Sequence, residues 1–146
     1  MVTEPIAARS GGTVTQPSAA DPRPRVQAGP DGHRRVAGRR CTACAEVTAF
    51  DWPRCPACRG EVEPADFGPE GVVWSSTVVR IPVPGRVPPY SLAYVDLDDG
   101  PRVLAHVVDG SWPTAEAAPI GGRVRLVPPS PDGDVRVQLL GSGVSA

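Results

Sequence analysis

All four cysteines of this 146-residue chain lie in one short segment, CTACAEVTAFDWPRCPAC. They form two pairs, and two residues separate the members of each pair. This spacing is typical of a tetrahedral metal site in which each pair lies on a tight turn and the two turns face each other. Four thiolates leave no open coordination position, so the metal is expected to be structural. We therefore assign the ligands as Cys41, Cys44, Cys55 and Cys58.

Zinc is the metal that this pattern favours, and iron is the alternative. The second pair, CPAC, resembles the rubredoxin turn, in which four thiolates hold one iron that carries electrons. Rubredoxins are short, however, whereas here a long β-rich region follows the cysteines. Between the pairs only Val47, Phe50 and Trp52 are available for a core. Metal ligation, worth about 10–16 kcal/mol in small zinc peptides, therefore has to stabilise the ribbon.

The composition favours strands and loops over helices. The chain has 19 prolines and 16 glycines, which leave little room for helices of three or more turns. No run of 18 apolar residues and no secretory signal is evident in the sequence, so we expect a cytoplasmic protein that does not enter a membrane. Thiols stay reduced in that compartment, which again favours metal ligation over disulfides.

The N-terminal region has no hydrophobic period. Residues 1–32 are rich in Pro, Ala, Gly, Ser and Thr, and we expect them to form a disordered tail. The segment HRRVAGRR, residues 33–40, carries four arginines. We interpret it as a solvated linker, with docking to a partner as the alternative.

Five segments in the second half of the chain have the composition or alternation of strands. Tight turns join two pairs of them, and in the first turn Asp99 and Gly100 are expected to supply positive φ values. Residues 111–121 are expected to form a short helix or an irregular crossover. A small antiparallel sheet leaves exposed edges unless it closes, so we predict a five-stranded OB-fold barrel, with an open sheet or sandwich as the alternative. The strand segments are residues 71–80, 90–97, 102–109, 122–127 and 135–140.

The chain resembles a family of bacterial and archaeal proteins that join a rubredoxin-like zinc ribbon to an OB-fold, long known only as a domain of unknown function. The resemblance runs from Arg40 to about Leu140 and rests on CTAC, CPAC, GVVWSSTVV, PVPGRVPPYSLAYVDLDDGPRVLAHVV and IGGRVRLV. It implies a mostly β chain with a disordered tail (1–32), a zinc ribbon (33–66) and an OB-fold (67–146). The family usually has glycine after the second cysteine of each pair, whereas this chain has Ala45 and Arg59.

The resemblance also implies a function. Members of this family are non-catalytic accessory subunits of thiolase-superfamily enzymes, aldolases, acyltransferases or other acyl-CoA enzymes. By this resemblance the chain is part of a hetero-oligomer, holds a structural Zn²⁺, docks through its OB-fold and helps to enclose a CoA thioester that it shares with the partner.

The residues themselves favour an interaction protein over an enzyme. There is no Gly-rich phosphate loop and no Ser–His–Asp framework, and His106 lies in a strand, where we expect a core or interface residue. The proline-rich loop RIPVPGRVPPY offers exposed apolar residues, and Arg86 and Tyr90 are residue types that dominate interfaces. We assign Arg86, Tyr90, Arg54 and Trp74 as partner or substrate contacts. The alternative is a rigid loop that closes the barrel end.

A single-stranded nucleic-acid-binding protein is the alternative function. OB-folds and zinc ribbons bind nucleic acids through positive grooves and exposed aromatic residues. From Cys41 to Ala146 the chain has 8 arginines and 13 acidic residues, a net charge of −5. Nucleic-acid binding is therefore disfavoured, although Trp74, Tyr90 and Tyr94 could stack a base. A rubredoxin-type electron carrier is a third hypothesis.

Overall fold

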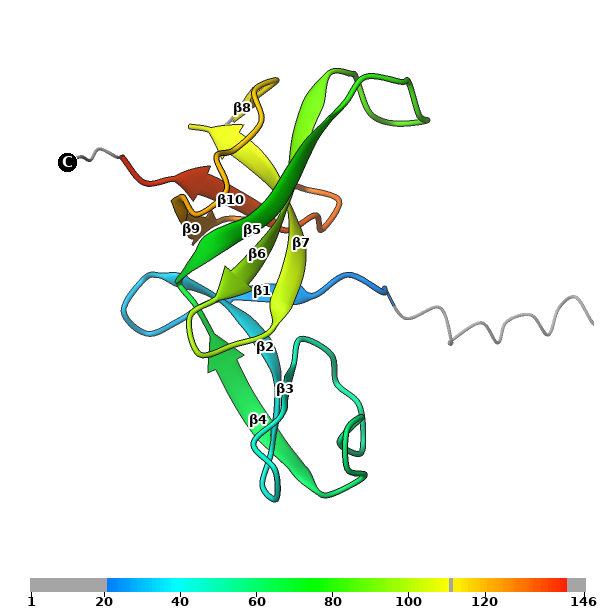
Figure 1. Cartoon of the computed structure of the whole chain (residues 1–146), viewed down its shortest axis with the longest axis vertical. Coiled ribbons are helices and arrows are strands. Elements are labelled where there is room, and N and C mark those ends of the chain that lie inside the picture. The colour runs from blue at the N-terminus through cyan, green and yellow to red at the C-terminus, as the bar shows by residue number, and fades with distance from the viewer. Residues whose placement is uncertain (1–20, 111, 142–146) are drawn as a thin grey trace, which may run out of the picture.

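The computed structural model describes residues 21–110 and 112–141. All the secondary-structure elements within these ranges are β-strands. Figure 1 shows a small sheet at the bottom and a barrel above it. The prediction of a mostly β chain with a ribbon followed by an OB-fold is confirmed. Within the described residues there is no helix with the length and apolar character that crossing a bilayer requires.

The smaller sheet is organised around β2 (Arg34–Cys41). Three short strands pair with it in antiparallel fashion: β1 (Arg25–Ala28), β3 (Val47–Thr48) and β4 (Val62–Phe67). The expectation that residues 33–40 form a solvated linker was wrong. Strand alternation explains the difference, because Val36 is fully buried while the neighbouring arginines remain partly exposed.

The disordered tail that we expected over residues 1–32 extends too far along the chain, because a strand lies within this range. Residues 25–28 form β1, which pairs with residues 34–37 of β2. Only Val26 of this strand packs against the hydrophobic core, so the sequence carries no alternating pattern that would indicate a strand. Backbone hydrogen bonds to β2 hold it instead. Residues 1–20 lie outside the described residues.

The barrel consists of five strands that form a closed circuit (Figure 1). Going round it, β5 pairs with β6, β6 with β7, β7 with β10, β10 with β9, and β9 with β5. All pairs are antiparallel except β7 with β10, so the predicted OB-fold is confirmed. Between β7 and β9 the chain forms the short β8 (Trp112–Pro113) and an irregular crossover rather than a helix. The strands are β5 (Glu70–Val79), β6 (Tyr90–Leu97), β7 (Arg102–Asp109), β9 (Arg123–Val127) and β10 (Arg136–Leu139).

One hydrophobic core runs from the barrel into the ribbon sheet. Alternate residues of the barrel strands point inward, such as Val95 and Val137, which are fully buried. Val36, Ala49 and Phe67 of the ribbon belong to the same cluster. Gly100, in the turn between β6 and β7, lies so close to Phe67 that an added Cβ would be 2.8 Å from the Phe67 Cβ. The two units are therefore packed directly against each other.

Strand β5 is irregular at Trp74, where the sequence indicates continuous alternation. Val73 pairs with Val95 and Ser75 pairs with Tyr94, so Trp74 is the additional residue of a β-bulge. The bulge reverses the alternation after residue 74 and leaves the Trp74 side chain 51% exposed. A local sequence pattern does not show a bulge, because it depends on the pairing with the neighbouring strand.

Candidate functional site

The four cysteines converge at the end of the ribbon. The four Sγ atoms all lie within 4.8 Å of one another. The Sγ atoms of Cys41 and Cys58 are 3.6 Å apart, and those of Cys44 and Cys55 are 3.7 Å apart. Four thiolates at about 2.3 Å from one tetrahedral zinc would be separated from each other by about 3.8 Å. The arrangement therefore fits a single ion bound by all four thiolates.

Backbone N–H groups point at the sulfurs from both turns. Ala43 and Cys44 donate to the Sγ of Cys41, at 3.3 and 3.4 Å. Ala57 and Cys58 donate in the same way to the Sγ of Cys55, at 3.3 and 3.4 Å. The hydrogen bonds from Cys44 and Ala43 lower the pKa of Cys41 to about 6, because they stabilise its thiolate. Each turn thus points two backbone N–H groups at the sulfur of its first cysteine, and at Cys41 they favour the anionic form that binds a metal.

Both turns end in a left-handed residue although neither has glycine there. Ala45 has a φ of 70° and Arg59 a φ of 67°. Their N–H groups close the turns by donating to the carbonyls of Cys41 and Cys55, at 3.1 and 2.9 Å. The family's turn geometry is therefore kept, and the departure from glycine appears as backbone strain rather than as a changed fold.

The expected ribbon core of Val47, Phe50 and Trp52 does not form. Phe50 and Trp52 are 37% and 46% exposed and stack on each other, with 5.7 Å between ring centroids. Ala49, on the same loop, is the buried residue. The ribbon instead obtains apolar packing from Val36, Ala49 and Phe67, which join the barrel core, and Val47 packs against the same core.

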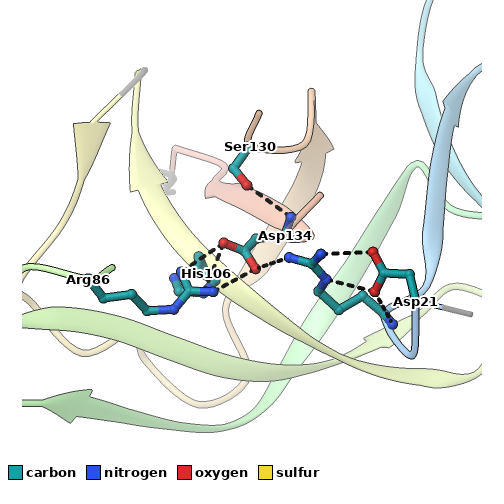
Figure 2. Close-up of polar contacts among 6 residues, drawn as sticks. Asp21, Arg86, His106, Ser130 and Asp134 are labelled. Atoms are coloured by element: carbon teal, nitrogen blue, oxygen red, sulfur yellow. Dashed lines mark hydrogen bonds and ion pairs between the residues drawn. The ribbon is translucent and has the colours of Figure 1, made fainter. Parts of the chain in front are cut away.

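A cluster of ion pairs surrounds Asp134 on the loop between β9 and β10. Its carboxylate accepts hydrogen bonds from Arg86, at 2.7 and 2.9 Å, and from Arg23, at 3.0 Å. Its backbone N–H donates to the Ser130 hydroxyl at 2.9 Å. Figure 2 shows Arg86 and His106 approaching the carboxylate from one side. The Arg86 hydrogen bonds, with those of Arg23, hold the pKa of Asp134 far below its usual range.

This cluster changes the roles expected for Arg86 and Tyr90. The guanidinium of Arg86 anchors the proline-rich loop to the barrel through Asp134. Tyr90 is only 7% exposed, and its ring stacks on His106 with 5.5 Å between centroids. Burial lowers the pKa of His106, so the imidazole is held in its neutral form beside the ring. The expectation of a core or interface histidine agrees with this environment, whereas direct contact of Arg86 or Tyr90 with a partner stays a prediction.

Trp74 and Arg54 lie in different places. Arg54 is exposed in the loop before Cys55. Trp74 lies on the outer face of the barrel, where the Arg102 guanidinium is 3.7 Å from its ring and Tyr94 meets it edge-on at 6.2 Å. The structure therefore brings Arg86 and Tyr90 together but places the other two assigned contacts elsewhere.

A groove of about 560 Å³ runs over β6 and β7. Asp134 and Arg86 are at one end of its lining, and Tyr94, Arg102 and Leu104 also line it. Sequence reasoning missed Asp134, Arg102 and Leu104 as members of a site. Each is an ordinary residue of a strand or turn in the sequence, and only strand pairing brings them together.

Comparisons with known proteins agree with this architecture. A family model described as the C-terminal OB-fold domain of ChsH2 matches residues 65–127. A DUF35 domain-containing scaffold protein of Methanothermobacter thermautotrophicus is 31% identical over 96 residues, which cover 63% of this chain and 70% of the relative. This chain belongs to the DUF35 family. A DUF35 scaffold protein of Pyrococcus furiosus is 42% identical over 60 residues, covering 39% of this DUF35 chain and 44% of the relative.

Two solved structures are similar to this DUF35 chain. A chain of the Ltp2–ChsH2(DUF35) aldolase has 25% sequence identity and a TM-score of 0.58, over 72% of this chain and 84% of that chain. A DUF35 protein of unknown function from Sulfolobus solfataricus has 16% identity and a TM-score of 0.52, over 72% and 75% of the two chains. At that identity the second likeness shows the fold alone.

Proposed function

We propose that this chain is a non-catalytic accessory subunit that docks through its OB-fold onto a thiolase-like or related acyl-CoA-processing enzyme. Membership of the DUF35 family carries this proposal, because two relatives are named scaffold proteins and a similar chain belongs to an aldolase with Ltp2. The complex would be a hetero-oligomer in which the partner supplies the catalytic residues. The partner would be a thiolase, an aldolase or an acyltransferase.

The described side chains support a non-catalytic role. All four cysteines, the strongest nucleophiles of the chain, point at one another. His106 is stacked on Tyr90, and the carboxylate next to it is already bound by two arginines. His106 lines the groove, but the carboxylate that would orient it as a general base is committed to the two arginines. The chemistry that the chain supports is binding.

The ribbon would contribute stability through one Zn²⁺ ion held by Cys41, Cys44, Cys55 and Cys58. The sulfur separations and the N–H groups that point at the sulfurs fit this ion. The ion would have a structural role, because four thiolates complete its coordination. In this position it would hold the two turns together at the end of the sheet.

The barrel would also help to bind or enclose the acyl-thioester substrate at the junction with the partner. The groove over β6 and β7 combines aromatic rings with arginine side chains, as Tyr94 and Arg102 illustrate. The Arg102 guanidinium is paired with Asp96, so the groove would receive the apolar arm of a CoA thioester rather than its phosphates. The CoA thioester would then be shared with the partner.

Co-expression tests the proposal directly. The chain is produced together with the proteins encoded by the neighbouring genes, thiolase-superfamily enzymes first, and each mixture is analysed by size-exclusion chromatography and by assay of the enzyme. We expect one complex that contains both chains, and an enzyme that is insoluble or much less active alone. If the enzyme is soluble and fully active without this chain, the proposal fails.

Single-stranded nucleic-acid binding is the second candidate, and the exposed Trp74 and Tyr94 favour it. Tyr94 is 44% exposed on β6, the second barrel strand, on the face that OB-folds use to bind oligonucleotides, and Trp74, 51% exposed on β5, lies beside it. A fluorescent oligonucleotide titrated with micromolar protein tests this function. A salt-dependent rise in anisotropy would support it, and an unchanged signal at low salt would remove it.

A further inference from the structure

An exposed hydrophobic patch covers three neighbouring strands on the outer face of the barrel. We define this Trp74 patch by Trp74 of β5, Tyr94 of β6 and Leu104 of β7. The three side chains are 51%, 44% and 45% exposed. Tyr94 and Leu104 are directly opposite each other in the β6–β7 pair, and the rings of Trp74 and Tyr94 are in edge-on contact. The patch is therefore continuous, unlike the scattered apolar residues of an ordinary surface.

The bulge in β5 belongs to this patch. Trp74 is the additional residue between Val73, which pairs with Val95, and Ser75, which pairs with Tyr94. A bulge interrupts the hydrogen bonding of a strand and redirects a side chain, and bulges are common next to functional sites. Gly71 and Val73 point into the barrel, so Trp74 faces outward, and the bulge places Ser75 on the same outer face opposite Tyr94.

The patch carries no net charge. Arg102 is the charged side chain in contact with it, and its guanidinium lies 3.7 Å from the Trp74 ring centroid. The same guanidinium donates two hydrogen bonds to the Asp96 carboxylate, at 2.6 and 3.1 Å. Its charge is therefore neutralised within the chain. An uncharged surface is complementary to an apolar one, whereas a nucleic acid needs unpaired cations along its backbone.

We propose that the Trp74 patch is the surface through which this chain docks onto its partner enzyme. The partner presents an uncharged apolar segment that covers the three side chains and extends into the adjoining groove, which Tyr94, Arg102 and Leu104 also line. This inference rests on the proposed accessory function and moves the main contact from Arg86 and Tyr90 to the patch. Tryptophan, tyrosine and arginine are the residue types that contribute most at interfaces.

The test compares two tryptophans of the same chain. Trp74→Ala removes the largest side chain of the patch. Trp112→Ala is the matched control, because Trp112 is 76% exposed on β8, which pairs with the end of β7 farthest from Leu104. The full-length variants are titrated against the purified thiolase-superfamily enzyme that the co-expression experiment identifies as the partner. We expect Trp74→Ala to raise the Kd at least about 30-fold, as for an interface hot spot. Trp112→Ala should change the Kd less than about 3-fold.

A second variant and a stability measurement distinguish loss of binding from loss of folding. Leu104→Glu places a charge on the patch and should also raise the Kd at least about 30-fold, while urea unfolding confirms that both patch variants are folded. If the wild-type chain binds the enzyme and both variants bind equally well, the inference is overturned while the accessory function stands. If the wild-type chain does not bind, the accessory function and the inference fail together. Loss of oligonucleotide binding or of self-association in Trp74→Ala, with enzyme binding unchanged, would also overturn it.

Discussion

Arg86 and Asp134, which are 48 residues apart in the sequence, form a bidentate ion pair with N···O distances of 2.7 and 2.9 Å. Arg23, in the segment that precedes β1, donates a hydrogen bond to the same carboxylate at 3.0 Å. Asp134 therefore connects three parts of the chain: the proline-rich loop, the turn before β10 and the segment that leads into the ribbon sheet. The ion pair gives Arg86 a positioning role within the chain.

Replacing Asp134 should destabilise the fold. The carboxylate is 9% exposed, and Asp134→Asn would weaken its hydrogen bonds to two charged arginines. We expect the free energy of unfolding in urea to fall by about 1–2 kcal/mol, because both arginines are about one-third exposed and partly screened. Asp132→Asn, an exposed aspartate two residues away, is the control and should change stability by less than about 0.5 kcal/mol. Equal stability of the two variants would contradict the role of Asp134.

Enlarging Gly100 should disturb the contact between ribbon and barrel. An added Cβ would lie 2.8–2.9 Å from three atoms of Phe67, a residue that is 2% exposed. Gly100→Ala should therefore lower the free energy of unfolding by about 1–3 kcal/mol. The double variant with Phe67→Ala should show a smaller added cost of Gly100→Ala, because two of the three opposing atoms, Cγ and Cδ1 of Phe67, are then absent. Strictly additive costs would show that the close contact is absent in solution.

Glycine at the end of each cysteine turn should stabilise the ribbon. Ala45 and Arg59 have φ values near 70°, a conformation that costs about 1–2 kcal/mol for residues other than glycine. Ala45→Gly and Arg59→Gly should each raise the free energy of unfolding by about 0.5–1 kcal/mol after the entropic cost of glycine. Ala43→Gly, in the same turn without a positive φ, should lower it. Thermal unfolding of the metal-loaded proteins would measure these effects, and destabilisation by both turn-end variants would refute the strain.

His106 should make stability depend on pH. Burial lowers its pKa in the folded chain, against the opposing effect of Asp134 and with the help of Arg86 and Arg136. The contribution of the neutral imidazole is thus complete above the unfolded pKa of about 6.5 and is lost as the pH falls below it. The stability difference between the wild type and His106→Gln should therefore be smaller at pH 5.5 than at pH 7.5. Release of the metal at low pH affects both proteins equally and cancels in this comparison. A stability difference that does not change with pH would contradict this account.

Local patterns predicted the parts of the molecule that depend on nearby residues. The spacing of Cys41, Cys44, Cys55 and Cys58 was enough to predict that their sulfurs converge. Alternation located the barrel strands, because each one has a buried face and an exposed face. Closure of the barrel followed from the physical cost of an open edge.

The rest depends on contacts that a sequence pattern does not contain. Four of the eight residues of β2 are arginines, and β1 is held to β2 by backbone pairing rather than by alternating apolar residues. Gly100 was expected to supply a positive φ, but among the two turn residues only Asp99 does, and Gly100 is required by the proximity of Phe67. Asp134 meets Arg23 across 111 residues. Such pairs become visible only when the barrel is closed.

Elemental analysis of the freshly purified, reduced chain is the most direct test of the central claim that four thiolates hold one metal ion in a catalytically silent ribbon. We predict one zinc per chain, and complete loss of zinc in Cys55→Ser together with unfolding of the ribbon. One iron per chain and a red colour would replace zinc with a rubredoxin-type centre. A reduced wild-type chain without stoichiometric metal would contradict the claim.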